Sequence, residues 1–426
     1  MINKFNNMEE FLSFVENQKR VTNKQNLNDM YAFAEVLGNP QKGINFVHVT
    51  GTNGKGSVVQ YLKEMFLIHG LKVGTFTSPY IEKFNERITV NSKFISDNDT
   101  LRLANLILDN YPKFYELTNT YPSFFEFITL LAFLYFKEQK VDVVVLEVGI
   151  GGLLDSTNIV DSITSVISNV SYDHMNILGN TLEEILHQKL GIVKKNQPCI
   201  IGIKDEKLLK LAELECLEKN AKLIAPLFKA IEIKKCDELG SEFVLDGFGE
   251  IKIKMLGKHQ IENAVVALYA FIEAYPLIAK KNYDITLIKK ALLNTFWLGR
   301  LEIVKEKPFT IIDGGHNIDG INRVCEFIKT LNYHTKRCIF SCSSNKEKFK
   351  MLNVLKETFD EIIITEFTYK RHNEAKELFD AIDMENKLLL PSIDDAIDYV
   401  NNHPFDLNLY VGSLYFVSEI RPKLLS

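Results

Sequence analysis

Residues 48–57 read H-V-T-G-T-N-G-K-G-S, which combines glycines, one lysine and a hydroxyl residue in the manner of a phosphate-binding loop. The spacing differs from the common form G-x-x-x-x-G-K-[ST], because Gly56 stands between Lys55 and Ser57. Glycine amides approach a polyphosphate closely, a lysine neutralises its charge, and a helix N-terminus favours an anion. We therefore expect phosphate binding here. The alternative is a tight strand-to-helix turn with a solvated Lys55.

A second candidate is E-V-G-I-G-G-L-L-D-S-T-N at residues 147–158. Glu147 ends an apolar run in which a charge needs a partner. A carboxylate beside bound phosphates commonly holds Mg²⁺. The alternative is a buried Glu147 that is hydrogen-bonded to the glycine-rich turn after it.

A third candidate is N-V-S-Y-D-H at residues 169–174, where Asp173 and His174 follow an expected strand. That position favours a site, although a loop histidine is often only a hydrogen-bonding residue. The sequence T-L-E-E at 181–184 predicts a capped helix start. Lys189 would lie two turns into that helix among leucine and isoleucine, and these apolar neighbours predict a snorkelling lysine.

A fourth candidate lies in the C-terminal part, where residues 311–320 read I-I-D-G-G-H-N-I-D-G. Asp313 and His316 occupy a glycine-rich turn between an expected strand and an expected helix. Such a turn can bind ribose or a small amino acid. The alternative is a plain helix start that is capped by Asn317 or Asp319.

These segments belong to two series of alternating strands and helices, which predict parallel sheets covered by helices. The fold class is α/β with two domains: an N-terminal P-loop ATPase-like parallel sheet with flanking helices over 1–296, and a smaller C-terminal Rossmann-like domain over 297–426. A hairpin-like pattern interrupts the series at 243–255. Ligands of open parallel sheets bind at the carboxyl ends of the strands, so the residues after the strands are the candidates.

Composition narrows the class of protein. The chain has 426 residues, 46% of them hydrophobic, with a net charge of −5, which argues against a nucleic-acid partner. Its six cysteines show no C-x-x-C spacing, and its first residues lack the pattern of a secretory signal. No run reaches the roughly 18 apolar residues of a membrane span. We expect a cytoplasmic protein with reduced thiols and no membrane partner.

Taken together, the motifs resemble the folylpolyglutamate synthase/dihydrofolate synthase family of the Mur ligase superfamily, whose phosphate loop also places Gly and then Ser or Thr after the lysine. The resemblance covers nearly the whole chain. Its motifs are L-G-N-P (37–40), the loop at 48–57, T-S-P-Y (77–80), F-N-E-R-I (84–88), F-E-F-I-T (125–129), E-V-G-I-G-G (147–152), D-S-T-N (155–158), D-H (173–174), L-G-N-T (178–181), K-L-G-I-V-K (189–194), G-K-H-Q-I-E-N-A (257–264), G-R-L-E (299–302), D-G-G-H-N (313–317) and G-S-L-Y (412–415).

The resemblance implies roles for individual residues. Ser78 and Glu147 would bind Mg²⁺, His174 would bind a second metal, Lys189 would be carbamylated, and His316 would handle the incoming glutamate. A monovalent cation such as K⁺ is a further expected cofactor. The contacts implied for ATP are Thr52, Asn53, Gly54, Lys55, Gly56, Ser57, Asn263, Arg300 and Asp313.

The implied reaction joins L-glutamate to the γ-carboxylate of tetrahydrofolate through an acyl phosphate, with glutamylation of dihydropteroate as an additional activity. A monomer is the expected state. The alternatives are a Mur-type peptidoglycan ligase and a nucleotide-binding switch without ligase chemistry. Leu153 stands where many relatives have arginine, L-G-R at 298–300 replaces P-G-R, D-G-G-H-N replaces D-G-A-H-N, and S-S-N-K-E-K at 343–348 replaces A-D-K-D. These departures concern substrate preference, because the nucleotide and metal residues are retained.

Overall fold

The computed structural model describes residues 4–18, 25–343, 347–368 and 374–425. By its internal contacts the chain divides into two compact units. The first comprises residues 1–228 and 263–292, and the second comprises 229–262 and 293–426. Part of the predicted A-D-K-D replacement, residues 344–346, lies outside the described residues.

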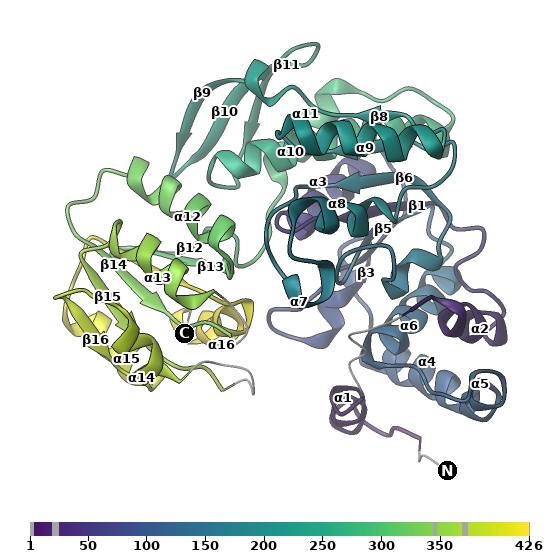
Figure 1. Cartoon of the computed structure of the whole chain (residues 1–426), viewed down its shortest axis with the longest axis horizontal. Coiled ribbons are helices and arrows are strands. Elements are labelled where there is room, and N and C mark those ends of the chain that lie inside the picture. Colours follow the sequence, from purple (N-terminus) through teal and green to yellow (C-terminus); the bar gives the residue numbers. More distant parts are fainter. Residues whose placement is uncertain (1–3, 19–24, 344–346, 369–373, 426) are drawn as a thin grey trace. The chain divides into compact units, whose positions relative to one another are not determined.

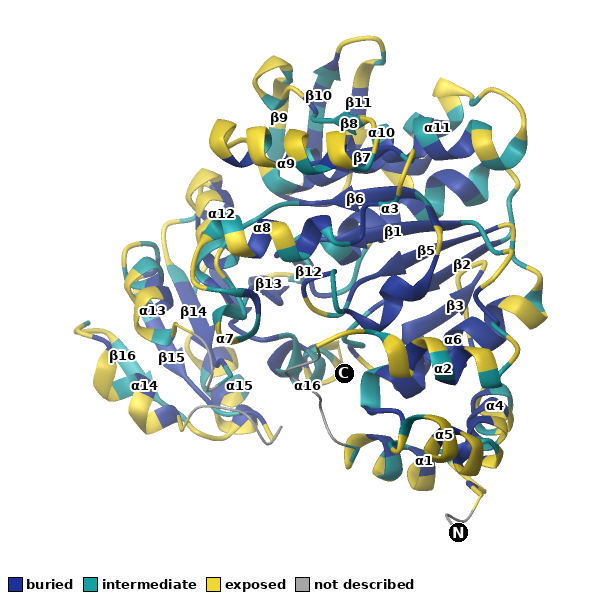
Figure 2. Ribbon diagram, turned by 45° about the vertical axis from the view of Figure 1, so that its right-hand side comes forward, coloured by how far each residue is buried: buried dark blue, intermediate teal, exposed yellow. Residues whose placement is uncertain are grey.

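The first unit is built on a sheet of eight strands in the order β4-β3-β2-β5-β1-β6-β7-β8. Figure 1 labels β3, β5, β1, β6 and β8 of this sheet. All neighbouring pairs are parallel except β2 with β3 and β3 with β4. The strand bounds are β1 Phe46–Thr50, β2 Val73–Phe76, β3 Ile88–Val90, β4 Lys93–Phe94, β5 Val143–Glu147, β6 Ser162–Ile167, β7 Cys199–Ile201 and β8 Leu223–Ile224. Figure 2 shows the central strands as buried, in agreement with their apolar sequences.

Helices pack against this sheet. The helix α3 (Lys55–Ile68) contacts β1, β2 and β5, and α8 (Leu182–Leu190) packs on α9 (Glu206–Glu218) next to β8. The remaining α-helices that lie wholly or mostly in this unit are α1 Met8–Glu16, α2 Asn28–Val36, α4 Asp97–Asp109, α5 Tyr111–Thr118, α6 Phe124–Gln139, α7 Met175–Leu178, α10 Lys258–Ala279 and α11 Ile285–Asn294. The helix α6 begins at Phe124, because Ser123 and Glu126 form a capping box there.

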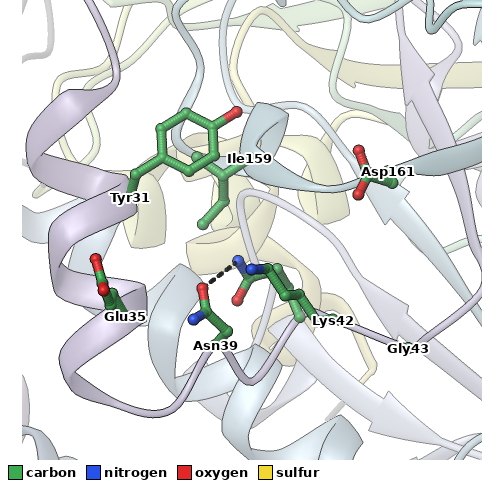
Figure 3. A pocket seen from close by; sticks show the side chains of 8 residues that line it. Tyr31, Glu35, Asn39, Lys42, Gly43, Ile159 and Asp161 are labelled. Atoms are coloured by element: carbon green, nitrogen blue, oxygen red, sulfur yellow. Dashed lines mark hydrogen bonds between the residues drawn. The ribbon is translucent and has the colours of Figure 1, made fainter.

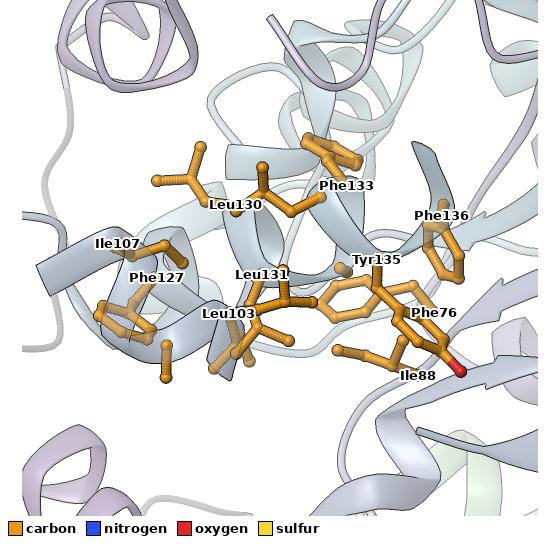
Figure 4. Close-up of a cluster of buried hydrophobic side chains, with 14 of the residues drawn as sticks. Phe76, Ile88, Leu103, Ile107, Phe127, Leu130, Leu131, Phe133, Tyr135 and Phe136 are labelled. Carbon is orange, nitrogen blue, oxygen red and sulfur yellow. The ribbon is translucent and has the colours of Figure 1, made fainter. Parts of the chain in front are cut away.

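A cluster of large apolar side chains joins α6 to the sheet. Figure 4 shows Phe76 and Ile88 from the strands beside Leu131 and Tyr135 from α6. Burying each such side chain contributes roughly 1.5–3 kcal/mol. The same cluster includes buried residues of β5, so it fixes β2 and β5, whose carboxyl ends lead to two of the predicted metal ligands.

The second unit contains a six-stranded sheet in the order β12-β13-β17-β14-β15-β16, in which only β12 runs antiparallel to its neighbour. Its strands are β12 Glu302–Glu306, β13 Phe309–Asp313, β14 Lys336–Phe340, β15 Glu361–Ile364, β16 Lys387–Leu389 and β17 Leu407–Val411. Its helices are α12 Ile318–Thr330, α13 Lys348–Lys356, α14 Ala375–Ala381, α15 Ile393–Asn402 and α16 Leu414–Leu425. The predicted two-domain α/β fold class is confirmed.

The predicted hairpin is larger than the sequence indicated. Three antiparallel strands form it: β9 (Glu232–Asp237), β10 (Gly240–Leu245) and β11 (Gly249–Ile253). The strand β9 escaped prediction because four of its six residues are exposed and its sequence, E-I-K-K-C-D, is mostly polar. This sheet groups with the second unit, whereas the predicted division placed it in the first domain. The predicted boundary at 296/297 stays a prediction.

The longest helix is α10 (Lys258–Ala279). Within the described residues it is the one helix whose length and composition would suffice to cross a membrane, and 61% of its apolar window is buried inside the structure. Core helices of globular proteins share this composition, so the helix by itself is weak evidence of a membrane span.

Candidate functional site

The glycine-rich segment joins the end of β1 to the start of α3. Gly54 caps α3 in the left-handed conformation, with φ of 80°. A Cβ atom at Gly54 would lie 2.4 Å from Oδ1 of Asn263, and one at Gly51 would lie 1.8 Å from Oγ of Ser168. Glycine is therefore required at both positions. The same contact brings Asn263, a predicted ATP ligand, against the loop.

Hydrogen bonds from the segment after β6 hold the loop in place. The amide of Asn53 donates to Oδ1 of Asn169 at 2.8 Å, and the amide of Thr52 donates to the Asn169 carbonyl at 3.2 Å. Oγ of Ser168 donates to the carbonyl of Asn53 at 2.6 Å. To bind phosphate as predicted, the amides of Thr52 and Asn53 must give up their hydrogen bonds to Asn169 and donate to phosphate oxygens instead. Asn169 was not singled out from the sequence, because nothing local distinguishes it from other loop asparagines.

Lys55 folds back over the loop. Its Nζ donates to the carbonyls of Gly51 at 3.1 Å and Thr52 at 3.3 Å. Gly56 and Ser57 follow within the first turn of α3, where backbone amides point out of the helix end. A lysine, a helix N-terminus and a buried hydroxyl residue therefore meet at one point, which is the arrangement that an anion needs.

The glycine at position 54 yields a test. Gly54→Ala is expected to lower the affinity for ADP at least about tenfold, because the added methyl group displaces Asn263 or the loop. Gly70→Ala is the matched control: Gly70 also has a positive φ, of 85°, but nothing lies within 4 Å of its added Cβ. Both variants should lose some thermal stability through backbone strain, and only Gly54→Ala should lose nucleotide affinity in calorimetric titration. Equal ADP affinities would contradict the close-approach argument.

Glu147 lies at the carboxyl end of β5, in register with Val49 of the neighbouring β1. Its side chain is 4% exposed, and its Oε2 accepts a hydrogen bond from the Ser78 amide at 3.2 Å. Ser78 follows β2, which pairs with β5 on the other side. The two predicted Mg²⁺ ligands are therefore neighbours at the sheet edge that carries the phosphate loop.

This donor set fits Mg²⁺, which binds one or two carboxylates together with substrate phosphates and water. Among the described residues, no group of three His, Cys, Asp or Glu side chains could hold a metal without such additional ligands. His174, predicted to bind a second metal, caps α7 with a left-handed backbone, φ 50°. Its Nε2 lies 4.0 Å from Oδ1 of Asp173.

The turn after Glu147 is fixed from both ends. Oδ2 of Asp155 accepts the amides of Gly149 at 3.1 Å and Ile150 at 3.0 Å. The amide of Leu153 donates to the Gln188 carbonyl of α8 at 2.7 Å. This turn therefore ties the Glu147 strand to the helix that carries Lys189.

Lys189 is only 2% exposed. The prediction of a snorkelling side chain, drawn from its apolar neighbours, is therefore wrong. Burial lowers the pKa of Lys189 well below its usual range, Lys55 lowers it further, and Asp173 opposes the shift. The structure thus brings a buried and readily deprotonated amine close to the phosphate-loop lysine.

His48 precedes the loop and is fully buried in β1. Its Nε2 is 2.8 Å from Oγ1 of Thr157, whose hydroxyl donates to Oδ1 of Asp155 at 2.5 Å. Burial, assisted by Lys194, lowers the pKa of His48 to about 3. The neutral imidazole therefore links the phosphate-loop strand to the glycine turn after Glu147.

This histidine predicts a pH dependence of stability. Its folded pKa lies below the unfolded value near 6.5, so the unfolded chain binds the extra proton and stability is lost as pH falls below about 6.5. At pH 5 the loss is on the order of 2 kcal/mol for this one group. His48→Gln should show a smaller fall in melting temperature than wild type between pH 7.5 and 5. An identical fall in melting temperature in the variant and the wild type would contradict the lowered pKa of His48.

The second unit gathers the C-terminal candidates around the end of β13. Asp313 accepts the amide of Leu301 at 2.8 Å and the amide of Gly315 at 2.6 Å, one on each carboxylate oxygen. Burial raises its pKa, while Arg300 and these two amides oppose the shift. Nδ1 of His316 lies 2.9 Å from the Gly314 carbonyl. The three predicted residues Arg300, Asp313 and His316 therefore form one cluster.

The helix start next to this cluster has one of the two caps that the sequence offered. Asn317 caps α12, accepting the Gly320 amide at 2.9 Å. Asp319 instead forms an ion pair with Arg323, which also contacts Glu262 at 3.2 Å. The turn can therefore both cap the helix and form the candidate site, because Asn317 caps α12 while Asp313 and His316 belong to the cluster.

A cavity of about 570 Å³ lies elsewhere in the first unit (Figure 3). Its lining includes Tyr31 and Glu35 of α2, Lys42 before β1 and Asp161 before β6. These residues lie at the amino ends of the strands, whereas the phosphate loop follows the carboxyl end of β1. None of the predicted site residues lines this cavity, so it is distinct from the candidate site.

Comparison with known proteins agrees with this geometry. Residues 49–271 match the Mur ligase middle domain, and residues 299–414 match the Mur ligase glutamate ligase domain. The dihydrofolate synthase/folylpolyglutamate synthase of Bacillus subtilis is 35% identical, covering 97% of this chain and 98% of the relative. The chain belongs to the folylpolyglutamate synthase/dihydrofolate synthase family.

Two further members share its full length. The folylpolyglutamate synthase of Lacticaseibacillus casei is 29% identical over 98% of this chain and 99% of the relative. The crystal structure of folylpolyglutamate synthase from Thermotoga maritima superposes with a TM-score of 0.84 at 28% identity, covering 98% of this chain and 96% of that one. As a member of this family the chain is a ligase of the acid–amino-acid class, and the Mur-type peptidoglycan alternative is not favoured.

Proposed function

We propose that this protein is an ATP-dependent ligase that adds L-glutamate to the γ-carboxylate of a reduced folate. The observation that carries the proposal is its 35% identity, over nearly the full length of both chains, to a relative named dihydrofolate synthase/folylpolyglutamate synthase. The phosphate loop, Glu147 and Lys189 meet at one sheet edge, which supports the same function.

The chemistry follows in two steps. An oxygen of the folate carboxylate attacks the γ-phosphorus of ATP, forming an acyl phosphate and releasing ADP. The amine of glutamate then attacks the acyl carbon, the amine proton is lost, and phosphate leaves. Lys55 and the N-terminus of α3 hold and neutralise the transferred phosphate, since such reactions depend mainly on positioning and charge stabilisation. Glu147 and Ser78 would hold Mg²⁺, which when bound would supply further neutralisation of the phosphate oxygens.

The remaining roles form part of the proposal. Asn263 would contact ATP beside Gly54, and Arg300 and Asp313 are further proposed ATP contacts. His316 would orient the incoming glutamate. His174 would bind a second metal ion, and a monovalent cation would assist. Family resemblance supports these assignments and the monomeric, cytoplasmic state; the net charge of −5 supports the absence of a nucleic-acid partner, while a membrane partner is not expected.

Lys189 is proposed to carry a carbamate. Its burial and its lowered pKa favour the neutral amine, which is the form that attacks CO₂. The resulting carboxylate would place a negative charge near Lys55. The positive charge of Lys55 would then stabilise the modified lysine, whereas it opposes the protonated one.

A second activity is favoured by one comparison. The Bacillus subtilis relative carries both names, dihydrofolate synthase and folylpolyglutamate synthase. Parallel assays with dihydropteroate and tetrahydrofolate, each with glutamate and ATP, would measure both. Mass spectrometry of the folate product should show one added glutamate with tetrahydrofolate. ADP formation without glutamate incorporation would instead favour a nucleotide switch.

A further inference from the structure

The loop after β2 is folded around one buried carboxylate. Oε2 of Glu86 accepts the amide of Ile81 at 2.8 Å, and Oε1 accepts the amides of Glu82 at 2.9 Å and Lys83 at 2.8 Å. The Glu86 side chain belongs to a 3₁₀ turn, η1 (Phe84–Arg87), and is 8% exposed. Three amides bound to one charged group form a strong local constraint, because hydrogen bonds to ionised acceptors are stronger than neutral ones.

The residues on either side of Glu86 attach this turn to the rest of the unit. Nδ2 of Asn85 donates to the Ile95 carbonyl at 2.7 Å and to Oδ1 of Asp97 at 2.9 Å. The carbonyl of Arg87 accepts the Thr77 amide at 2.9 Å. Glu86 therefore fixes the far end of the loop to a turn that is itself anchored to α4 and to the residue before Ser78.

The side chain of Arg87 adds a second attachment. Its guanidinium lies 5.0 Å from the ring centroid of Tyr80, inside the loop, and 5.6 Å from that of Phe124 at the start of α6. Such cation–π contacts hold the middle of the loop against the α6 side of the sheet. The short motif N-E-R therefore holds the loop between Thr77 and Lys83 at three points: its two ends by hydrogen bonds and its middle by the cation–π contact.

Ser78 is the second residue of this closed loop, and its amide donates to Oε2 of Glu147. We propose that Glu86 is a positioning residue for the metal site: by folding residues 78–83 it holds Ser78 against the Glu147 carboxylate and so sets the affinity for Mg²⁺. This inference rests on the proposed function, because it takes Glu147 and Ser78 as the Mg²⁺ ligands. Glu86 itself does not touch the reacting atoms.

The test variant is Glu86→Gln, which keeps the size of the side chain but removes its charge and one acceptor oxygen. The matched control is Glu82→Gln, a change in an exposed carboxylate of the same loop whose backbone amide, rather than side chain, contacts Glu86. The first readout needs no substrate: hydrogen exchange of the peptide spanning 78–83 should accelerate about tenfold or more in Glu86→Gln and remain unchanged in Glu82→Gln.

The second readout is the Mg²⁺ dependence of ADP formation. In Glu86→Gln the Mg²⁺ concentration at half-maximal rate should rise about fivefold to tenfold, with the rate at saturating Mg²⁺ within about threefold of wild type. A merely structural weakening would lower the melting temperature and the rate without moving the Mg²⁺ midpoint. Unchanged exchange, or faster exchange with an unchanged midpoint, would overturn the inference.

Two controls separate this inference from the proposed function. If wild type forms no ADP with folate and glutamate, the proposed function fails, while the exchange experiment still reports whether Glu86 holds the loop. If Glu86→Gln does not fold, Glu86→Asp provides the second variant, because its shorter carboxylate cannot reach all three amides. Wild-type exchange and Mg²⁺ midpoint in Glu86→Asp would overturn the positioning role.

Discussion

Lys55→Ala is expected to lower the rate of ADP formation about a thousandfold or more, while leaving the protein folded. Lys55 lies at the N-terminus of α3, and its Nζ reaches back over the loop to the carbonyls of Gly51 and Thr52. These contacts hold the ammonium group where the outer phosphates of ATP would lie. The substitution removes the positive charge and these two hydrogen bonds, but it leaves the loop glycines in place.

The measurement is ADP release with tetrahydrofolate and glutamate, together with the thermal melting curve. Lys63→Ala is the matched control, because Lys63 lies two turns further along the same helix and pairs with Glu64 at 3.1 Å. The control should retain activity, and both variants should melt within a few degrees of wild type. Near-normal turnover in Lys55→Ala would refute the phosphate-binding role of the loop.

Lys189→Ala is expected to have the second large effect, a loss of about a hundredfold or more in turnover. The wild-type side chain is buried beside Lys55 and Asp173, and its lowered pKa favours reaction with CO₂. The alanine variant lacks the carboxylate that the carbamate would supply. A small carboxylic acid such as acetate or formate fits the space left by the side chain, so it should restore part of the activity.

Three proteins are compared: wild type, Lys189→Ala and Lys195→Ala. The last is the matched control, because Lys195 is an exposed lysine just beyond the same helix. Turnover is measured with and without added acetate or formate, at constant ionic strength. One of these acids should raise the rate of Lys189→Ala and leave the other two proteins unchanged. Loss of activity without rescue by either acid would contradict the carbamate, and full activity in Lys189→Ala would remove Lys189 from the site.

The phosphate loop was predictable from sequence because its evidence is local. A buried strand, three glycines, Lys55 and the start of α3 all lie within one short segment, and the structure places them as expected. Glu147 and Ser78 were linked by resemblance alone. Their proximity follows from the pairing of β2 with β5, a long-range contact that spacing along the chain does not encode.

The environment of Lys189 could not be inferred from its apolar neighbours. The leucine and isoleucine residues near Lys189 indicate the apolar face of a helix, but they do not show whether a lysine on that helix reaches solvent. Here the glycine turn after Glu147 packs directly on α8: a Cβ at Gly152 would lie 2.8 Å from the Gln188 carbonyl. This close approach of distant segments buries the lysine, so the snorkelling prediction failed for a tertiary reason.

Glu86 belongs to the motif F-N-E-R-I at residues 84–88, but the sequence does not reveal its role. A charged residue in a polar loop usually indicates a solvated side chain, and the three amides that it binds carry no sequence signature. The strand β9 was missed for the same kind of reason, since its pairing with β10 outweighs its polar sequence. In both cases, backbone hydrogen bonds between residues apart in the sequence determine the local structure, and these bonds leave no pattern in the sequence.

The most direct test of the proposed function is the stoichiometry of the wild-type reaction. Purified protein is supplied with ATP, Mg²⁺, tetrahydrofolate and labelled L-glutamate, and both ADP and labelled folate are measured over time. We expect one ADP for each glutamate incorporated, with neither product formed when folate is omitted. A folded, metal-replete protein that forms no glutamylated folate, or that releases ADP without incorporating glutamate, would contradict it.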